Sequence, residues 1–326
     1  MAALTARRDH AAGLRAPIAV IGEAVIEEFK PRHANDRVLR TGGPAFRIAR
    51  ELALLGHASA LVGSLGQDHD AELLTQALED LGVRAFCTLR DGEATGRLRL
   101  TQKKHRVKRK VEHPVTQRIG FDQQQLNTID HAPLVVVAGF AFHDRKQHRG
   151  LLDSVLQPQN RLILDAKPPI GAEDDLVLVR ERIERHASSA LLVHLSASDS
   201  ELLFDAPVDE VTSYLLDLGA RNVLATEGSL GGRWVNREGL DVHEPAAELA
   251  GPVIDTVGAG DLVTALAVAQ LIEHREDHGP DAAVDEAWAR SFLRRAMHLA
   301  GHRIRGEVSW KGSCALALRG DEQWGD

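Results

Sequence analysis

The stretch Asp255-Thr256-Val257-Gly258-Ala259-Gly260-Asp261 runs directly into an apolar segment, Leu262 to Ile272. Its three small residues allow the backbone to turn tightly and to aim its N–H groups at one point. The apolar segment has the length and composition of a helix, so these N–H groups would lie at a helix N-terminus, which favours a bound phosphate. Asp261 would then take a proton from an attacking hydroxyl, or orient it. The pattern predicts phosphoryl transfer.

A Gly-Ala-Gly triplet alone has a simpler interpretation. It could form a tight loop in which Asp261 only caps the helix that follows. The rest of the chain is needed to choose between a phosphate site and a capped helix.

Composition restricts the class of protein. The 326 residues are 44% hydrophobic, enough for one large domain, and the formal net charge of −8 argues against binding to nucleic acid or to an anionic membrane. The two cysteines form no disulfide framework, which favours a reducing cytoplasm. Residues 1–16 contain arginines but no apolar block, so we expect a flexible leader rather than a secretory signal.

Apolar runs of strand length alternate with longer amphipathic segments of helical period. This alternation predicts a parallel sheet covered on both faces, with ligands bound beyond the carboxyl ends of its strands. The expected strands are residues 17–22, 58–62, 134–138, 161–164, 191–195 and 222–225, and the expected helices are residues 46–55, 70–81, 145–156, 174–186 and 208–218. Segments 27–41 and 95–112 break the pattern and suit a small antiparallel flap over the open end of the sheet.

Four motifs occur in an order that resembles the ribokinase-like, or phosphofructokinase-B (PfkB), sugar kinases. They are Gly22-Glu23 after the first strand, Gly42-Gly43-Pro44-Ala45, Gly63-Ser64-Leu65-Gly66-Gln67-Asp68 and the Gly-Ala-Gly-Asp signature. The resemblance covers about residues 17 to 316. It implies an α/β fold with three αβα layers, a mainly parallel central sheet and a small antiparallel β lid. The kinase domain is expected over residues 17–326.

The resemblance also implies roles for single residues, with ATP and Mg²⁺ as cofactors and a monovalent cation such as K⁺ as a further candidate. Asp261 matches the catalytic base, and Gly258, Ala259 and Gly260 match the amide cradle. Glu201 matches a Mg²⁺ ligand acting through water, although Ser198 to Glu201 also has the spacing of a helix capping box. The residues that match nucleotide contacts are Ser198, Thr226, Gly228, Gly231 and Lys167, the last of which could equally be a solvated loop lysine.

The acceptor side departs from the family pattern. Gly42 and Gly43 are retained, but Glu27 stands where the family usually has aspartate, and Arg47 stands where it usually has asparagine. Arg47 could bind an acidic substrate, pair with Glu27 and alter the pocket, or point to solvent. The basic residues around Arg97 resemble the lid of heptose-phosphate kinases, which read a substrate phosphate, although a solvated charged hairpin would have the same composition.

The function expected from these residues is ATP-dependent phosphorylation of a hydroxyl on a small sugar or sugar derivative, with a sugar phosphate or a sugar acid among the candidates. Two alternatives stay open: a catalytically altered nucleotide-binding sensor of the same fold, and a nucleoside kinase. We expect no nucleic-acid or membrane partner, and a homodimer formed through the lid, because exposed strand edges pair readily with a second copy.

Overall fold

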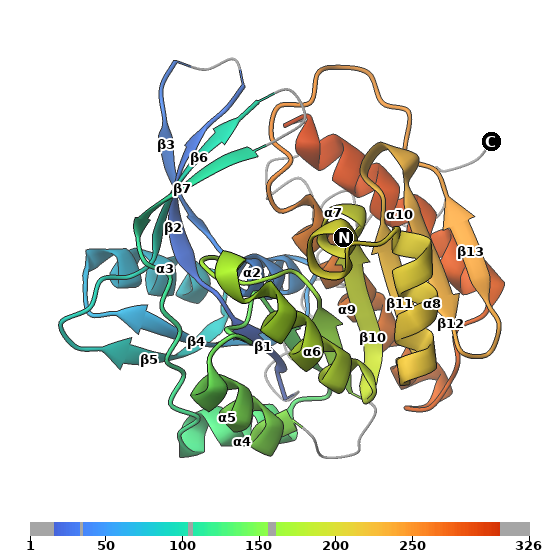
Figure 1. The fold of residues 1–326 in the computed structure, drawn as a ribbon, viewed down its shortest axis with the longest axis horizontal. Coiled ribbons are helices and arrows are strands. Elements are labelled where there is room, and N and C mark those ends of the chain that lie inside the picture. The colour runs from blue at the N-terminus through green and yellow to red at the C-terminus, as the bar shows by residue number, and fades with distance from the viewer. Residues whose placement is uncertain (1–15, 33–34, 104–106, 156–160, 307–326) are drawn as a thin grey trace, which may run out of the picture.

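A computed structural model describes residues 16–32, 35–103, 107–155 and 161–306. The leader expected over residues 1–16 falls almost wholly outside this set. Within the described residues, two sheets stand out: a large central one and a smaller one at one end of the molecule (Figure 1).

The central sheet has nine strands among the described residues, in the order β13-β12-β11-β10-β9-β8-β1-β4-β5. All neighbouring pairs from β11 to β5 are parallel, whereas β12 and β13 are antiparallel additions at one edge. This is the mainly parallel sheet that the sequence predicts. The strands are β1 (Ile18–Gly22), β4 (Ser59–Gly66), β5 (Arg84–Arg90), β8 (Val135–Ala138), β9 (Leu162–Asp165), β10 (Ala190–Ser196), β11 (Asn222–Thr226), β12 (Gly232–Asn236) and β13 (Asp241–Glu244).

Helices cover both faces of this sheet, which confirms the three-layer prediction. Because the central strands are buried on both sides, their sequences are continuous apolar runs rather than alternating ones. One core lies under α2 (Pro44–Leu54), α3 (His69–Glu79), α9 (Ala259–His278) and α10 (Glu286–Ile304). The other lies under α4 (Gln123–His131), α5 (Arg145–Val155), α6 (Leu176–Ala187), α7 (Ala197–Phe204) and α8 (Val208–Leu218). Two short 3₁₀ turns, η1 (Glu173–Asp175) and η2 (Gly228–Leu230), complete the elements.

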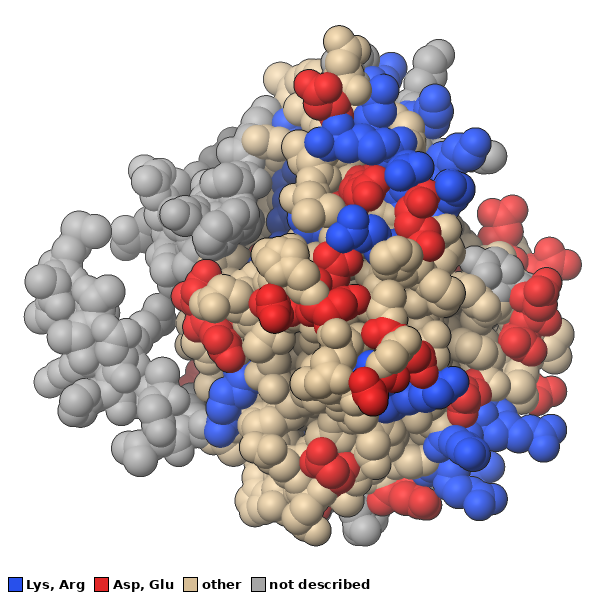
Figure 2. All heavy atoms as spheres, turned by 90° about the vertical axis from the view of Figure 1, so that its left-hand side faces the viewer, with Lys and Arg blue, Asp and Glu red and all other residues tan. Residues whose placement is uncertain are grey.

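The small sheet is the predicted lid, in the order β3-β2-β6-β7. It consists of two antiparallel hairpins that join through parallel pairing of β2 with β6. The strands are β2 (Val25–Lys30), β3 (Val38–Gly42), β6 (Arg97–Gln102) and β7 (Val107–His113). Lys and Arg side chains gather around this end of the molecule, interspersed with carboxylates (Figure 2).

The lid packs onto the large domain through its inner face. Phe29, Leu98 and Leu100 are buried there and contact Val257 of the signature loop and Ile170. This apolar contact holds the lid against the segment that carries the Gly-Ala-Gly-Asp signature. In the part of the chain that the structure describes, no helix is both long enough and apolar enough to cross a bilayer.

Candidate active site

The signature residues form the start of α9. Gly258 is the N-cap, with a φ of 84° that favours glycine, and the helix proper begins at Ala259. The amide of Ala259 bonds to the Thr256 carbonyl at 3.4 Å, and that of Leu262 bonds to the Gly258 carbonyl at 3.0 Å. Among the described residues, the amides of Gly258, Gly260 and Asp261 have no hydrogen-bond acceptor. These are the unpaired donors that an anion would satisfy.

Asp261 is the third residue of α9, and among the described residues its side chain bonds to Arg47 and Lys167 and to no backbone amide. The capping interpretation therefore does not describe it. Instead, its fully buried carboxylate accepts from Arg47 Nε at Oδ2 over 2.5 Å and from Lys167 Nζ at Oδ1 over 3.2 Å. Burial alone would raise the pKa of Asp261, but Lys167 and Arg47 outweigh it and hold that pKa well below its ordinary value.

Arg47 joins the base to the acceptor side of the site. Only 7% of Arg47 is exposed, and its Nη1 donates to Glu27 Oε1 at 2.6 Å. Of the three interpretations of Arg47, the structure therefore has the ion pair with Glu27, and it adds a second pair with Asp261. The other oxygen of Glu27 accepts from Arg40 Nε at 2.8 Å, and Arg40 also pairs with Asp255. Lid and signature loop are thus linked by charge.

The predicted glycines create room for this arrangement. A Cβ on Gly42 would lie 2.4 Å from the Glu27 carboxyl group, and one on Gly43, whose φ is 95°, would meet the Glu23 carbonyl at 2.4 Å. Any side chain at Gly42 would therefore displace Glu27 from its two arginines.

Glu23, in the first motif, is a buried carboxyl close to the same charges. Its Oε1 accepts from the Ile170 amide at 2.9 Å, while its buried Oε2 has no partner among the described residues. Burial raises the pKa of Glu23 to about 8. Glu23 is therefore mainly protonated at neutral pH, which keeps one negative charge out of the site.

A buried polar chain forms the floor beneath Asp261 and connects three strands with α9. Thr264 Oγ1 lies 2.9 Å from His194 Nδ1, and His194 Nε2 lies 3.2 Å from Thr226 Oγ1. Asp165 faces both His194 and Thr264 at 3.3 Å and accepts from the Lys167 amide at 3.1 Å. This chain ties the predicted nucleotide residues Lys167 and Thr226 to the catalytic helix. A histidine inside the apolar run of β10 was the one sequence signal for it.

The start of α7 differs from the expected capping pattern. The capping box is formed by Ser196 and Asp199, whose side chains bond to each other's backbone amides at 3.1 and 3.3 Å. Ser198 and Glu201 lie inside the helix and are exposed. The capping interpretation of Ser198–Glu201 is therefore wrong, because the helix starts two residues earlier. Asp199 is only 8% exposed, and it adds to the charges that raise the pKa of Lys167, after Asp261 and Asp165.

The other predicted residues fall in two places. Gly228 begins the 3₁₀ turn after β11, and Gly231 ends it with a φ of 113° and no room for a Cβ, which would lie 2.1 Å from the Glu244 carbonyl. Arg97, in contrast, pairs with Asp70 and with Glu28. Since Glu27 and Glu28 point to opposite faces of β2, Arg97 lies on the outer face of the lid, away from Glu27.

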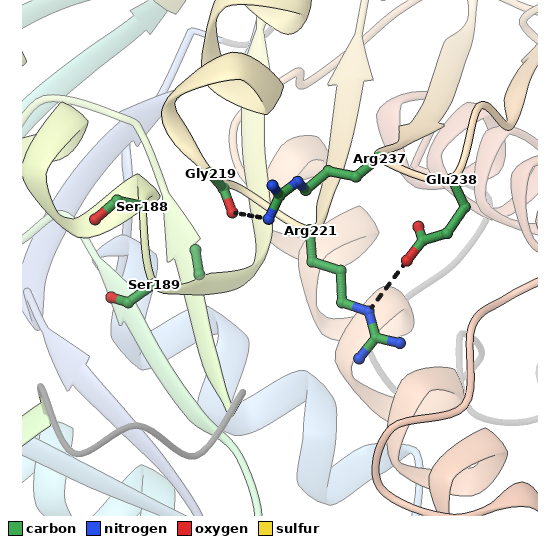
Figure 3. A pocket seen from close by; sticks show the side chains of 7 residues that line it. Ser188, Ser189, Gly219, Arg221, Arg237 and Glu238 are labelled. Carbon is green, nitrogen blue, oxygen red and sulfur yellow. Dashed lines mark hydrogen bonds and ion pairs between the residues drawn. The ribbon is translucent and has the colours of Figure 1, made fainter.

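A surface cavity of about 440 Å³ lies at the amino ends of strands β10 and β11 (Figure 3). Lys167 and Thr226, in contrast, lie at the carboxyl ends of β9 and β11. The two arginines of the cavity already have protein partners. Arg221 pairs with Glu238 at 3.8 Å, and Arg237 donates to the Gly219 carbonyl at 3.5 Å. The cavity is therefore separate from the charged group around Asp261.

Residues 16–287 match the family described as pfkB family carbohydrate kinase. This is most of the chain, so the chain belongs to that family. The description of the family names a carbohydrate kinase, that is, an enzyme that transfers a phosphoryl group to an alcohol group.

Curated relatives include the bifunctional protein HldE of Pseudomonas syringae pv. syringae (strain B728a), 25% identical over 286 residues that make up 80% of this chain and 57% of that protein. HldE of Halorhodospira halophila (strain DSM 244 / SL1) is 27% identical over 244 residues, or 71% of this chain and 47% of that protein. The chain therefore spans about half the length of the curated relatives it matches.

Three solved structures share the fold. A fructokinase from Xylella fastidiosa with bound ATP has a TM-score of 0.70 and 18% identity, covering 93% of this chain and 95% of that one. Aminoimidazole riboside kinase from Salmonella enterica, complexed with aminoimidazole riboside and an ATP analogue, has a TM-score of 0.66, 19% identity and coverage of 93% and 100%. Arabidopsis thaliana ribokinase, complexed with ribose and ATP, has a TM-score of 0.65, 18% identity and coverage of 94% and 100%.

Proposed function

We propose that this protein transfers the terminal phosphoryl group of ATP to a hydroxyl of a small sugar or sugar derivative. Asp261 acts as the base, and the amides of Gly258, Ala259 and Gly260 act as the anion hole. The observation that carries the proposal is the buried carboxylate of Asp261 in the first turn of α9, beside the amides of Gly258 and Gly260, which have no acceptor among the described residues.

The protein forms no covalent bond to the substrates in the chemical step. The acceptor oxygen forms a bond to phosphorus, the bond from phosphorus to the bridging oxygen breaks, and the hydroxyl proton passes to Asp261. Positioning and charge neutralisation supply most of the rate. Lys167, bonded to Asp261 and held by the Asp165 turn, supplies one positive charge near the phosphoryl group.

The acceptor pocket of this proposal is charged. Glu27, between Arg40 and Arg47, is the carboxylate that would accept from acceptor hydroxyls. Arg109 of β7 stands opposite Leu100, so it lies on the inner face of the lid, and its charge offsets part of the burial effect that raises the pKa of Glu23. A sugar carrying a phosphate or a carboxylate suits these cations better than a neutral sugar does. Arg97, on the outer face, is not part of this pocket.

A magnesium ion fits the residues on the nucleotide side if water and phosphate complete its shell. Among the described residues, no three His, Cys, Asp or Glu side chains come together as a metal site. Mg²⁺ in kinases is usually held by one or two carboxylates together with substrate phosphates, so this is no obstacle. Asp199 has a free Oδ1 among the described residues and is one of the carboxylates that raise the pKa of Lys167, so we assign it the water-mediated role first expected of Glu201. K⁺ has no assigned ligand.

A coupled ADP-release assay over sugars, sugar phosphates, sugar acids and nucleosides tests the proposal. Nucleosides belong in it because one structural neighbour is a riboside kinase. ADP release that depends on one acceptor class, with a phosphorylated product seen by mass spectrometry, supports the proposal. A rate of ADP release that is the same with and without each acceptor contradicts the proposal.

A second candidate is a nucleotide-binding sensor that no longer phosphorylates sugars. The ion pairs of Asp261 with Arg47 and Lys167 favour it, because two cations lower the affinity of the carboxylate for a hydroxyl proton. This candidate predicts ATP binding by calorimetry and no product with any acceptor. One productive acceptor excludes it.

Two further properties belong to the proposal. The edge strand β3 exposes Val38 and Leu39, each about half exposed, and a homodimer through the lid would cover them. Light scattering of the purified chain tests this dimer. A cytoplasmic location suits a chain with two isolated cysteines and a phosphorylated metabolite as substrate.

A further inference from the structure

The guanidinium of Arg47 lies where three parts of the site meet. It bonds to Asp261 and to Glu27, and its shaft lies against Gly258. A Cβ on Gly258 would be 2.8 Å from Arg47 Cδ and 3.1 Å from Nε. Arg47 is therefore in contact with the first residue of the amide cradle, as well as with the base.

Two cations lie beside the amide cradle. Arg47 and Lys167 both lie at the N-terminus of α9, where the helix dipole and the unpaired amides are already positive. Among the described residues, Asp261 is the carboxylate that bonds to both cations, whereas Glu27 bonds to Arg47 and Arg40, and Asp165 and Asp199 act on Lys167 through their charge. In addition, Nη2 of Arg47 has no acceptor among the described residues. One donor of a nearly buried guanidinium is thus unused.

The same ion pair restrains the base. Each oxygen of Asp261 accepts from one cation, and the two cations lower the affinity of the carboxylate for a hydroxyl proton, so the departure of one cation would raise that affinity. Arg47 makes the shorter contact, and it is the cation that touches Gly258. An anion bound at the cradle would compete with Asp261 for Arg47.

We propose that Arg47 is a catalytic residue that exchanges Asp261 for an oxygen of the transferred phosphoryl group. The exchange places a positive charge on the phosphoryl group during transfer and at the same time frees Asp261 as base. It breaks and forms no covalent bond beyond those of the transfer itself. The inference rests on the proposed function, since it assigns a role within that reaction.

Binding measurements without an acceptor test the exchange separately from turnover. Arg47→Asn should weaken binding of β,γ-imido-ATP by at least about tenfold while leaving ADP binding unchanged, because only the former carries the third phosphate. Arg47→Lys keeps the charge but loses the planar guanidinium with its several donors, so its loss of β,γ-imido-ATP affinity should be intermediate. Arg50→Asn is the matched control: it lies on the same helix, pairs with Glu51 at 2.7 Å, and should leave both affinities unchanged. Thermal unfolding of all three variants checks folding, and Arg47→Lys carries the test if Arg47→Asn unfolds.

Turnover supplies the second half of the test. With a productive acceptor, Arg47→Asn should lower kcat by roughly 10²-fold or more and leave the acceptor KM nearly unchanged. Equal loss of both nucleotide affinities, or none, overturns the inference. A raised acceptor KM at constant kcat also overturns it, because Arg47 would then bind an anionic group of the acceptor. A raised kcat overturns it as well, because Arg47 would then inhibit the base. If no acceptor is phosphorylated at all, the proposed function fails while the two nucleotide affinities still decide on Arg47.

Discussion

Gln102 of the lid accepts hydrogen bonds at Oε1 from both the amide and the hydroxyl of Thr256, at 3.3 and 3.2 Å. Thr256 lies two residues before Gly258. The end of β6 is therefore fastened to the loop that forms the amide cradle, so that lid closure and cradle geometry depend on each other.

Gln102→Ala should weaken this coupling. We expect kcat/KM for the acceptor to fall roughly tenfold and acceptor-independent ATP hydrolysis to rise, because an open lid admits water to the transferred group. Gln76→Ala is the control, since Gln76 is exposed on α3 and bonds only to Asp80 among the described residues. If both variants hydrolyse ATP at the parental rate, the lid is not held by Gln102.

Asp199 and Glu201 can be separated as magnesium residues. Asp199→Asn should raise the Mg²⁺ concentration needed for half-maximal activity about tenfold, whereas the exposed Glu201→Gln should leave it unchanged. Magnesium titrations at saturating ATP provide the measurement. The reverse ranking would restore Glu201 to the metal site and contradict the assignment made from the position of the helix start.

Glu23→Gln should stabilise the protein at alkaline pH. Burial raises the pKa of Glu23 to about 8, above its ordinary value of about 4.3, so the folded state holds the proton more tightly than the unfolded state. Stability contributed by this proton is complete below about pH 4 and is lost as pH rises toward 8, at up to about 1.4 kcal/mol per pH unit.

Melting curves at pH 5 and pH 8.5 measure the Glu23 effect. The variant should match the parent at pH 5 and melt several degrees higher at pH 8.5, with Glu79→Gln on the exposed end of α3 as control. A variant that is less stable than the parent at pH 8.5 would show that the carboxylate form of Glu23 is the one the fold prefers.

Two buried histidines should make the protein sensitive to acid. Burial lowers the pKa of His186 to about 3 and that of His148 to about 4, and both rings pack against Phe142. Their unfolded pKa is about 6.5, so the stability from their neutral forms is complete above pH 6.5 and is lost as pH falls toward 4.

His186→Leu should therefore flatten the loss of stability between pH 6.5 and pH 4. The buried ring nitrogens of His186 have no partner among the described residues, so an apolar replacement removes an uncompensated polar group as well. Urea unfolding across this pH range measures the slope, with His69→Leu, which alters an exposed residue, for comparison. Equal slopes for parent and His186→Leu would assign the acid sensitivity to other groups.

The layers of the fold could be predicted because the sequences of buried parallel strands are continuous apolar runs. The helix predicted over residues 208–218 coincides with α8, and the strand predicted over residues 222–225 lies within β11. The edge strands β5 and β13 escaped prediction because each has charged residues at its ends and lies at an edge of the sheet, where it has one neighbouring strand. Pairing with β4 and β12, which sequence patterns do not reveal, makes them strands.

The candidate site shows the same division between local and long-range information. The amide cradle and Asp261 follow from a local pattern, small residues before a helix. The contact of Asp261 with Arg47 and Lys167 joins residues 214 and 94 positions apart, and no local pattern contains it. At α7, two overlapping Ser-x-x-acid matches compete, Ser196 to Asp199 and Ser198 to Glu201, and only the point where β10 ends selects the first.

Comparison of Asp261→Asn with the parent is the measurement that tests the central claim most directly. With the best acceptor from the panel, product is followed by mass spectrometry and ATP binding by calorimetry. The account predicts that product formation falls by roughly 10³-fold while ATP affinity changes less than about threefold, because the base acts on the acceptor hydroxyl and not on the nucleotide. Product formation within a factor of ten of the parental rate would contradict the assignment of Asp261 as the base.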